Sequence, residues 1–160
     1  MQTEQITQRL AIGAGSAQVP QIIISSGTQY ANSDGVDMSK SRRAFFIAMI
    51  GAVTGGGSIS AYLQESADNA TWTANGTAGA FSGSGGNNVS QTGLTTSNKL
   101  YTFEVNASQL TTGKKFARLQ LKETGGQNVY VAIASFGDEA EHKPNSGNSS
   151  ANVVTQNVVS

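Results

Sequence analysis

Cysteine is absent from this chain of 160 residues, and histidine occurs only once. Without a thiol, the chain has no disulfide, no thiolate metal site and no cysteine nucleophile. The single histidine, His142, excludes a zinc site built on a histidine pair and leaves little basis for a histidine-dependent catalytic triad. These absences remove the commonest metal-binding and nucleophilic chemistries from consideration.

Charge is scarce as well, because ten basic and ten acidic residues make up only 12% of the chain and cancel to a formal net charge of zero. Scattered basic residues of this kind lack the positive patch that nucleic-acid binding requires. No apolar run reaches the roughly 18 residues of a membrane span, and the polar stretch 1–5 lacks the pattern of a secretory signal. We therefore expect no nucleic-acid partner and no membrane partner.

Neutral hydrogen-bonding side chains supply most of the polarity of the chain. Serine, threonine, asparagine and glutamine account for 58 residues, and glycine for another 19. Hydrophobic residues make up 38%, which is low but leaves enough apolar surface for one domain with a core at this length. The composition therefore indicates a folded, weakly charged domain.

Apolar and polar residues alternate with the period of two that is typical of half-buried β-strands. The predicted strands are 20–24, 44–53, 58–65, 100–105, 115–122 and 128–136, of which 44–53 is apolar throughout and is predicted to be buried. Glycine-rich links at 55–57 and 125–126 favour two hairpins. Segment 75–98 is predicted to be a long surface loop, and 106–110 a single helical turn capped by Asn106.

Short strands, glycine-rich turns and the lack of a long amphipathic helix indicate an all-β fold, an antiparallel β-sandwich that is jelly-roll-like with extended arms. We assign residues 1–19 to an N-terminal arm, 20–137 to the β-sandwich domain and 138–160 to a C-terminal arm. The β-branched content of 151–159 is typical of a strand that adds to the sheet edge of another subunit. A tail lying along its own domain is the alternative.

Two groups of ionisable residues are candidates for chemistry. Glu65 and Asp68 flank a predicted turn and could serve as a glycosidase pair, although turn and edge roles suit them better. His142 follows the acidic residues Asp138, Glu139 and Glu141, which would suit a metal or acid–base cluster. A solvated charged stretch after the last strand is the favoured interpretation there.

Other candidates are aromatic, basic or glycine-rich. Trp72 and Tyr62, joined by Tyr101, would make a sugar-stacking platform if they faced solvent together, whereas packing across the sandwich is the favoured alternative. The pair at 42–43 (Arg-Arg) reads as an edge or contact pair. Neither glycine run, at 55–57 or 83–86, is a phosphate loop, because no Lys-Ser/Thr and no helix follows. We therefore assign no catalytic, cofactor-binding or metal-binding residue and expect no enzyme.

Five stretches occur in a characteristic order: Val36–Lys40, Arg43–Phe46, Ala61–Trp72, Phe103–Val105 ahead of Leu110, and Lys115–Leu119. In this order, and above all in the third stretch, the chain resembles small virion proteins of tailed bacteriophages, of the kind that decorate or cement the capsid. The resemblance covers about residues 36–137 and leaves the two arms outside.

The resemblance implies a non-enzymatic structural protein, without cofactor or metal, that binds the outer surface of a phage head and clamps neighbouring subunits of the major capsid protein. It also implies contacts between neighbouring copies, as a homo-oligomer, and a place on the virion surface after synthesis in the host cytoplasm. Phage tail and head-fibre proteins use similar sandwiches. A tail or head-fibre component that binds carbohydrate for host attachment is therefore the alternative.

Overall fold

The computed structural model describes residues 11–12, 21–23, 30–53, 57–74, 77–81, 90–94, 96–123 and 125–140. Their elements are β1 (Ala11–Ile12), β2 (Gln21–Ile23), β3 (Tyr30–Asn32), β4 (Val36–Asp37), β5 (Ser41–Ile50), β6 (Ile59–Ser66), β7 (Ser90–Leu94), β8 (Lys99–Asn106), the 3-10 turn η1 (Ala107–Gln109), β9 (Phe116–Glu123) and β10 (Val129–Ala140). The predicted arms lie outside the described residues, apart from β1 and the last three residues of β10.

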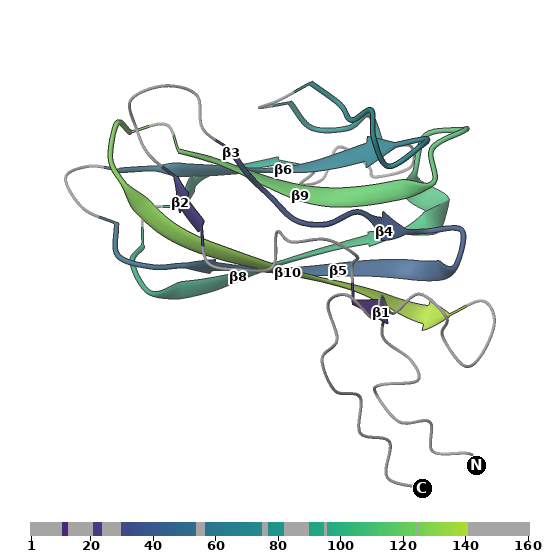
Figure 1. Cartoon of the computed structure of the whole chain (residues 1–160), viewed down its shortest axis with the longest axis horizontal. Helices are drawn as coiled ribbons and strands as arrows, with labels where there is room; N and C mark the ends of the chain where they lie inside the picture. The colour runs from purple at the N-terminus through teal and green to yellow at the C-terminus, as the bar shows by residue number, and fades with distance from the viewer. Residues whose placement is uncertain are drawn as a thin grey trace, which may run out of the picture.

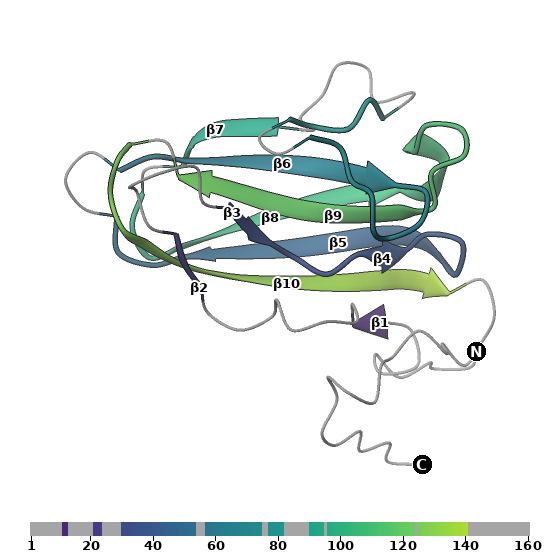
Figure 2. The ribbon, with the colours of Figure 1, turned by 45° about the horizontal axis from the view of Figure 1, so that its top comes forward.

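The strands form two antiparallel sheets that pack face to face (Figures 1 and 2). Sheet A has the order β1-β10-β5-β8, with β2 also paired to β10, and sheet B has the order β3-β9-β6-β7, with β4 also paired to β9. Each link of these orders is an antiparallel pair. The predicted β-sandwich is therefore confirmed.

The pairing follows the scheme of a jelly roll. The outer parts of the chain pair with each other, β1 and β2 with β10, and β3 and β4 with β9. Inside them β5 pairs with β8, and β6 pairs with β7 at the centre of the nest. Nested antiparallel pairs wound into two facing sheets make up the double Greek key of that architecture.

Both predicted hairpins are wrong. β5 and β6, joined through the glycines at 55–57, belong to different sheets, and so do β9 and β10, joined through Gly125 and Gly126. In each of these two pairs, one strand lies in sheet A and the other in sheet B. Each strand packs its apolar face against the opposite sheet, because two facing sheets share one core. The glycine-rich links therefore cross from one layer to the other instead of turning within a layer.

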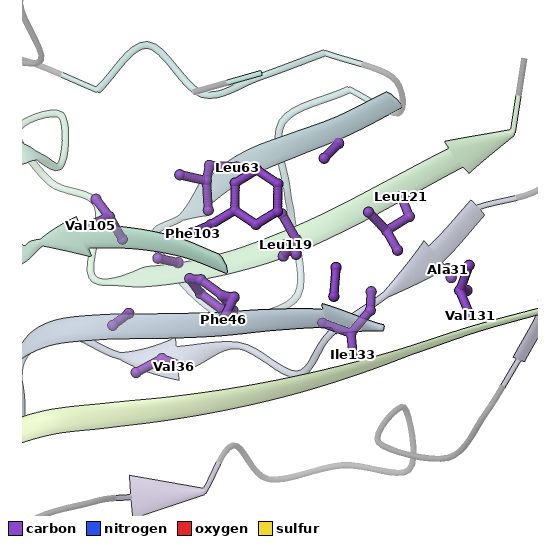
Figure 3. Close-up of a cluster of buried hydrophobic side chains, with 14 of the residues drawn as sticks. Ala31, Val36, Phe46, Leu63, Phe103, Val105, Leu119, Leu121, Val131 and Ile133 are labelled. Carbon is purple, nitrogen blue, oxygen red and sulfur yellow. The ribbon is translucent and has the colours of Figure 1, made fainter. Parts of the chain in front are cut away.

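The core between the sheets is built from the alternate apolar residues of the long strands (Figure 3). From sheet A, Phe46 is fully buried and Ile133 is 2% exposed, and they meet Leu119 and Leu121 of sheet B, which are both fully buried. Burying a side chain of this size contributes roughly 1.5–3 kcal/mol. The period of two predicted from the sequence thus places the core residues of β6, β8 and β9 as expected.

Two other predicted segments differ in outcome. The turn after β8 is confirmed, since η1 follows Asn106, whose backbone N–H donates to Gln109 Oε1 at 2.8 Å. The predicted loop 75–98 is only partly a loop, because β7 lies within it and pairs with β6. Phe81 from the same segment is 4% exposed and joins the core, so parts of this polar stretch belong to the sandwich.

Candidate functional site

Glu65, at the end of β6, is only 3% exposed. Its Oε1 accepts hydrogen bonds from the Ala80 N–H at 3.2 Å and from the Thr111 hydroxyl at 2.7 Å, and its Oε2 accepts one from the Thr111 N–H at 3.0 Å. Gly79 packs against the same side chain, where an added Cβ would lie 2.8 Å from Cγ of Glu65. The carboxylate therefore ties two loops to β6, as a structural clamp does.

Asp68 organises the tight turn that follows β6. Its Oδ1 accepts the backbone N–H of Thr71 at 2.7 Å and of Ala70 at 3.0 Å, as well as the hydroxyl of Ser66 at 2.9 Å. These hydrogen bonds, that of the Thr71 N–H foremost, hold the pKa of Asp68 well below its ordinary value. The two predicted glycosidase carboxylates thus accept hydrogen bonds from the protein's own turn and loops, which fits the turn and edge roles.

Trp72 lies outside sheet B and is half-buried, rather than packed across the sandwich. The guanidinium of Arg118 sits 4.4 Å from the centre of its ring, and the far edge of the indole lies against Gly35. Tyr62 is also on the outer face of sheet B, but Tyr101 packs against the core from sheet A. The structure therefore does not bring the three predicted platform residues together.

Beneath the segment that follows β6 lies a buried polar cluster that sequence reasoning missed. Gln64 is fully buried on the outer face of sheet B, and its Nε2 lies 3.1–3.2 Å from the carbonyl oxygens of Thr73, Ala74 and Thr77. Its Oε1 accepts a hydrogen bond from Nε of Arg118 at 2.9 Å. Burial lowers the pKa of Arg118 to about 10, so the guanidinium stays charged at neutral pH. This cluster fastens the segment that follows β6 to sheet B. The described part of that segment runs along the outer side of β6 (Figure 1).

Only part of the predicted charged stretch at 138–142 lies among the described residues. Asp138 lies within β10, beside Arg43 of β5 in the sheet register, and is 9% exposed. Glu141 and His142 lie outside the described residues, so the predicted acidic and histidine cluster is only partly in view. Among the described residues, no group of three or more histidine, aspartate or glutamate side chains could hold a metal ion.

The outer face of sheet A is the most unusual surface of the described chain. Met49, Leu100 and Tyr130 are 39%, 66% and 57% exposed and are the only exposed large hydrophobic residues among those described. Met49 and Tyr130 each stand between buried neighbours, and Leu100 is on the opposite phase from the buried Phe103 and Val105 of β8, so all three point away from the core. Except for Arg43, the half-buried residues of the same phase on β5 and β10 are also apolar. Together these residues form what we call the apolar face: Phe45, Ile47, Met49, Leu100, Tyr130, Ala132, Ala134 and Phe136.

The strands that carry this surface, β8, β5 and β10, are neighbours in sheet A (Figure 2). Most of its residues lie on β5 and β10, and Leu100 extends it onto β8. Met49 is paired with Leu100 on one side and with Ala132 on the other, which gives one apolar row across the sheet. A parallel row joins Phe45 to Phe136, and there the apolar surface ends at an ion pair between Arg43 Nε and Glu104 Oε1 at 3.1 Å. Of the predicted pair at 42–43, only the second arginine borders this face.

An antiparallel sheet with one solvated side normally carries polar residues there. Contiguous exposed apolar residues on a folded domain mark a contact surface. The sequence indicated this apolar face, because both alternating sets of residues in segment 44–53 are apolar. That segment is predicted to be buried, yet only its alternate residues Ala44, Phe46, Ala48 and Ile50 are buried, so this prediction is wrong for the outer side.

No protein-family model, curated protein or solved structure matches the chain. None of the helices in the described part of the chain has the length and apolar character to cross a membrane. The candidate site is therefore defined by the apolar face itself, together with the polar cluster on the opposite side of the sandwich.

Proposed function

We propose that this protein is a non-enzymatic structural protein of a tailed-phage virion, a capsid decoration (cement) protein. It binds the outer surface of the head and stabilises contacts between neighbouring subunits of the major capsid protein. The single observation that supports this most is the apolar face on the outer side of sheet A. The resemblance of residues 36–137 to decoration proteins supplies the identity of the partner.

The apolar face suits a contact that does not depend on ions. Complete burial of a leucine or aromatic side chain contributes roughly 1.5–3 kcal/mol, and Leu100 and Tyr130 are still about half to two-thirds exposed. Covering them with capsid protein would recover about 1–2 kcal/mol each. Because the formal net charge is zero, such binding would be weakened little by salt screening. Binding only to the assembled shell stabilises that shell by mass action.

The size of the face sets a limit on its strength. Three strands about 4.8 Å apart and roughly eight residues long cover about 400 Å², and the apolar face is smaller than this, because β8 adds only Leu100 to it. The face therefore covers at most half of the ~800 Å² that each partner contributes to a standard interface. A decoration protein that docks through this face therefore needs either several weak contacts per particle or additional contacts from neighbouring copies.

The experiment is a rebinding assay with shells of the major capsid protein from the same virus. Wild-type protein should sediment with the shells, and a Leu100→Lys, Tyr130→Lys variant should bind at least about tenfold more weakly, because two desolvated apolar contacts are lost. A matched control, Thr112→Lys with Asn128→Lys, adds the same charge at exposed positions of two turns. Wild-type protein that does not bind, or a face variant that binds as well as the control, would contradict the proposal.

The alternative, a carbohydrate-binding tail or head-fibre component, has less support. Arg118 covers one face of Trp72, and Tyr62 lies four residues from Ser66, the bridge partner of Trp72, along β6. That spacing is about 13 Å, and the buried Gln64 lies between. Glycan binding that is lost in a folded Trp72→Ala variant would favour this alternative over decoration.

A further inference from the structure

The second open feature of sheet A is the edge formed by β8. This strand of eight residues pairs with β5 on one side, and in the described part of the chain no strand pairs with its other side. It contains neither proline nor glycine, and its charged residues are Lys99 and Glu104, the second of which is paired with Arg43. A long edge without such protection is a template for pairing with another strand.

Apolar side chains are left open on both sides of this edge. Leu100 on the outer side is 66% exposed, and Tyr101 on the core side is only half-buried. A strand that lay beside β8 would therefore need apolar side chains at both phases of its alternation. It would extend the apolar face on one side and the core on the other.

The sequence holds one segment of that description, 151–159. Its nine residues are enough to lie along all eight residues of β8, and no charged side chain occurs from Pro144 to Ser160. Val153 and Val159 fall on one phase of a strand, and Val154 and Val158 fall on the other. Backbone hydrogen bonds to an open sheet edge supply affinity in strand addition, and alternate side chains supply specificity.

The connection to this segment is long enough to leave the domain. β10 ends at Ala140, and Pro144 cannot donate to a ladder, so it interrupts a continued central strand. The ten residues 141–150 can span up to about 33 Å. Within the described residues Leu100 is 66% exposed and β8 has no partner on its outer edge, and a connection of this length can reach that edge on a neighbouring copy.

We propose that residues 151–159 of one copy add as a strand along β8 of a neighbouring copy. This extends sheet A beyond β8, covers Leu100 and links copies through their C-terminal segments. The inference deepens the proposed function, since an added strand would widen the apolar face that is too small by itself for a standard interface. It concerns only contacts between copies, however, and is tested without capsid, so the two proposals can fail separately.

The absence of cysteine permits a direct test with the full-length chain. Two single-cysteine variants, Thr102→Cys on β8 and Thr155→Cys in the segment, are mixed and treated with a short bismaleimide linker. Thr102 is exposed on the outer side of the edge strand, so its substitution leaves the core intact. The matched control replaces Thr102→Cys by Thr77→Cys, an exposed position over sheet B. We expect a crosslinked heterodimer in the first mixture and at least about tenfold less in the control.

A second measurement examines the same contact without a crosslink. The full-length variant Val154→Asp, Val158→Asp should sediment as a smaller species than wild type and should lose amide protection over β8, whereas Ser146→Asp, Ser149→Asp should behave like wild type. A linker that closes only within a Thr102→Cys, Thr155→Cys double variant, with no heterodimer, would show that the tail folds back on its own domain and would overturn the proposal. Crosslinks between two Thr102→Cys copies alone, or a monomeric wild-type protein, would also overturn it.

Discussion

The buried carboxylate of Glu65 gives the sharpest test of whether the described polar residues are structural. Replacing Glu65→Ala removes the acceptor of two backbone N–H groups, those of Ala80 and Thr111, and of one hydroxyl. A donor left without a partner costs about 1–3 kcal/mol. Water can reach the exposed Ala80, so we take the lower half of that range and expect a total loss of about 3 kcal/mol in the free energy of unfolding.

That loss is measurable by urea or thermal denaturation of the purified protein. For a chain of this size each kcal/mol shifts Tm by roughly 2–4 °C, so Tm should fall by about 6–12 °C. The conservative change Glu65→Gln keeps one oxygen acceptor but places an amide near the Thr111 N–H, and it should cost about 1–2 kcal/mol.

Glu104→Ala is the matched control, because it removes a carboxylate whose side chain is 47% exposed and whose ion pair lies at the surface. Surface pairs of that kind contribute about 0–1 kcal/mol. A Glu65→Ala variant that is as stable as the Glu104→Ala variant would refute the clamp and would reopen a chemical role for Glu65.

Three further predictions concern the outer side of sheet B. Gln64→Leu should destabilise the protein by about 2 kcal/mol and speed amide exchange and proteolysis at 73–77, because the segment loses its buried amide donor; unchanged exchange there would contradict this role. Trp72→Ala should lower the free energy of unfolding by about 1 kcal/mol, because the contact with Arg118 is lost. Unchanged stability in urea would show that this contact does not stabilise the protein. Since its folded-state pKa is depressed, Asp68 stabilises the fold above its ordinary pKa near 4, and this stability declines as pH falls toward the lower folded-state pKa. Asp68→Asn should therefore flatten the acid side of the stability profile, whereas an unaltered profile would contradict the assignment.

The sequence predicted the strands better than it predicted their partners. In β6 and β9, Leu63 and Leu119 alternate with polar neighbours, and the period of two is a local property that the chain displays by itself. The glycines at 55–57 and 125–126 likewise mark chain reversals. Whether a reversal stays in one sheet or crosses to the other depends on which apolar faces meet, and that is settled by residues far apart in the chain.

The candidate surface shows the same division. The apolar run 44–53 indicated a strand whose two alternating sets of residues are both apolar. That pattern by itself predicts a strand buried on both sides. Only the strand order shows that nothing among the described residues covers Met49 and Leu100, because β5 and β8 lie in an outer layer of the sandwich. Gln64 illustrates the converse, since the period of two places this polar residue on the outer side of β6, and the structure buries it there under the segment 73–77.

By itself the sequence determined the all-β class, the position of most of the long strands, the inward side chains of β6, β8 and β9, and the scarcity of charge and of metal-binding groups. These follow from composition and from a periodicity that spans a few neighbouring residues. The jelly-roll pairing, the crossing of the glycine-rich links, the clamp at Glu65 and the open apolar side of sheet A were decided only in the tertiary structure. The physical reason is that each depends on contacts between segments far apart in the chain, which a local pattern does not encode.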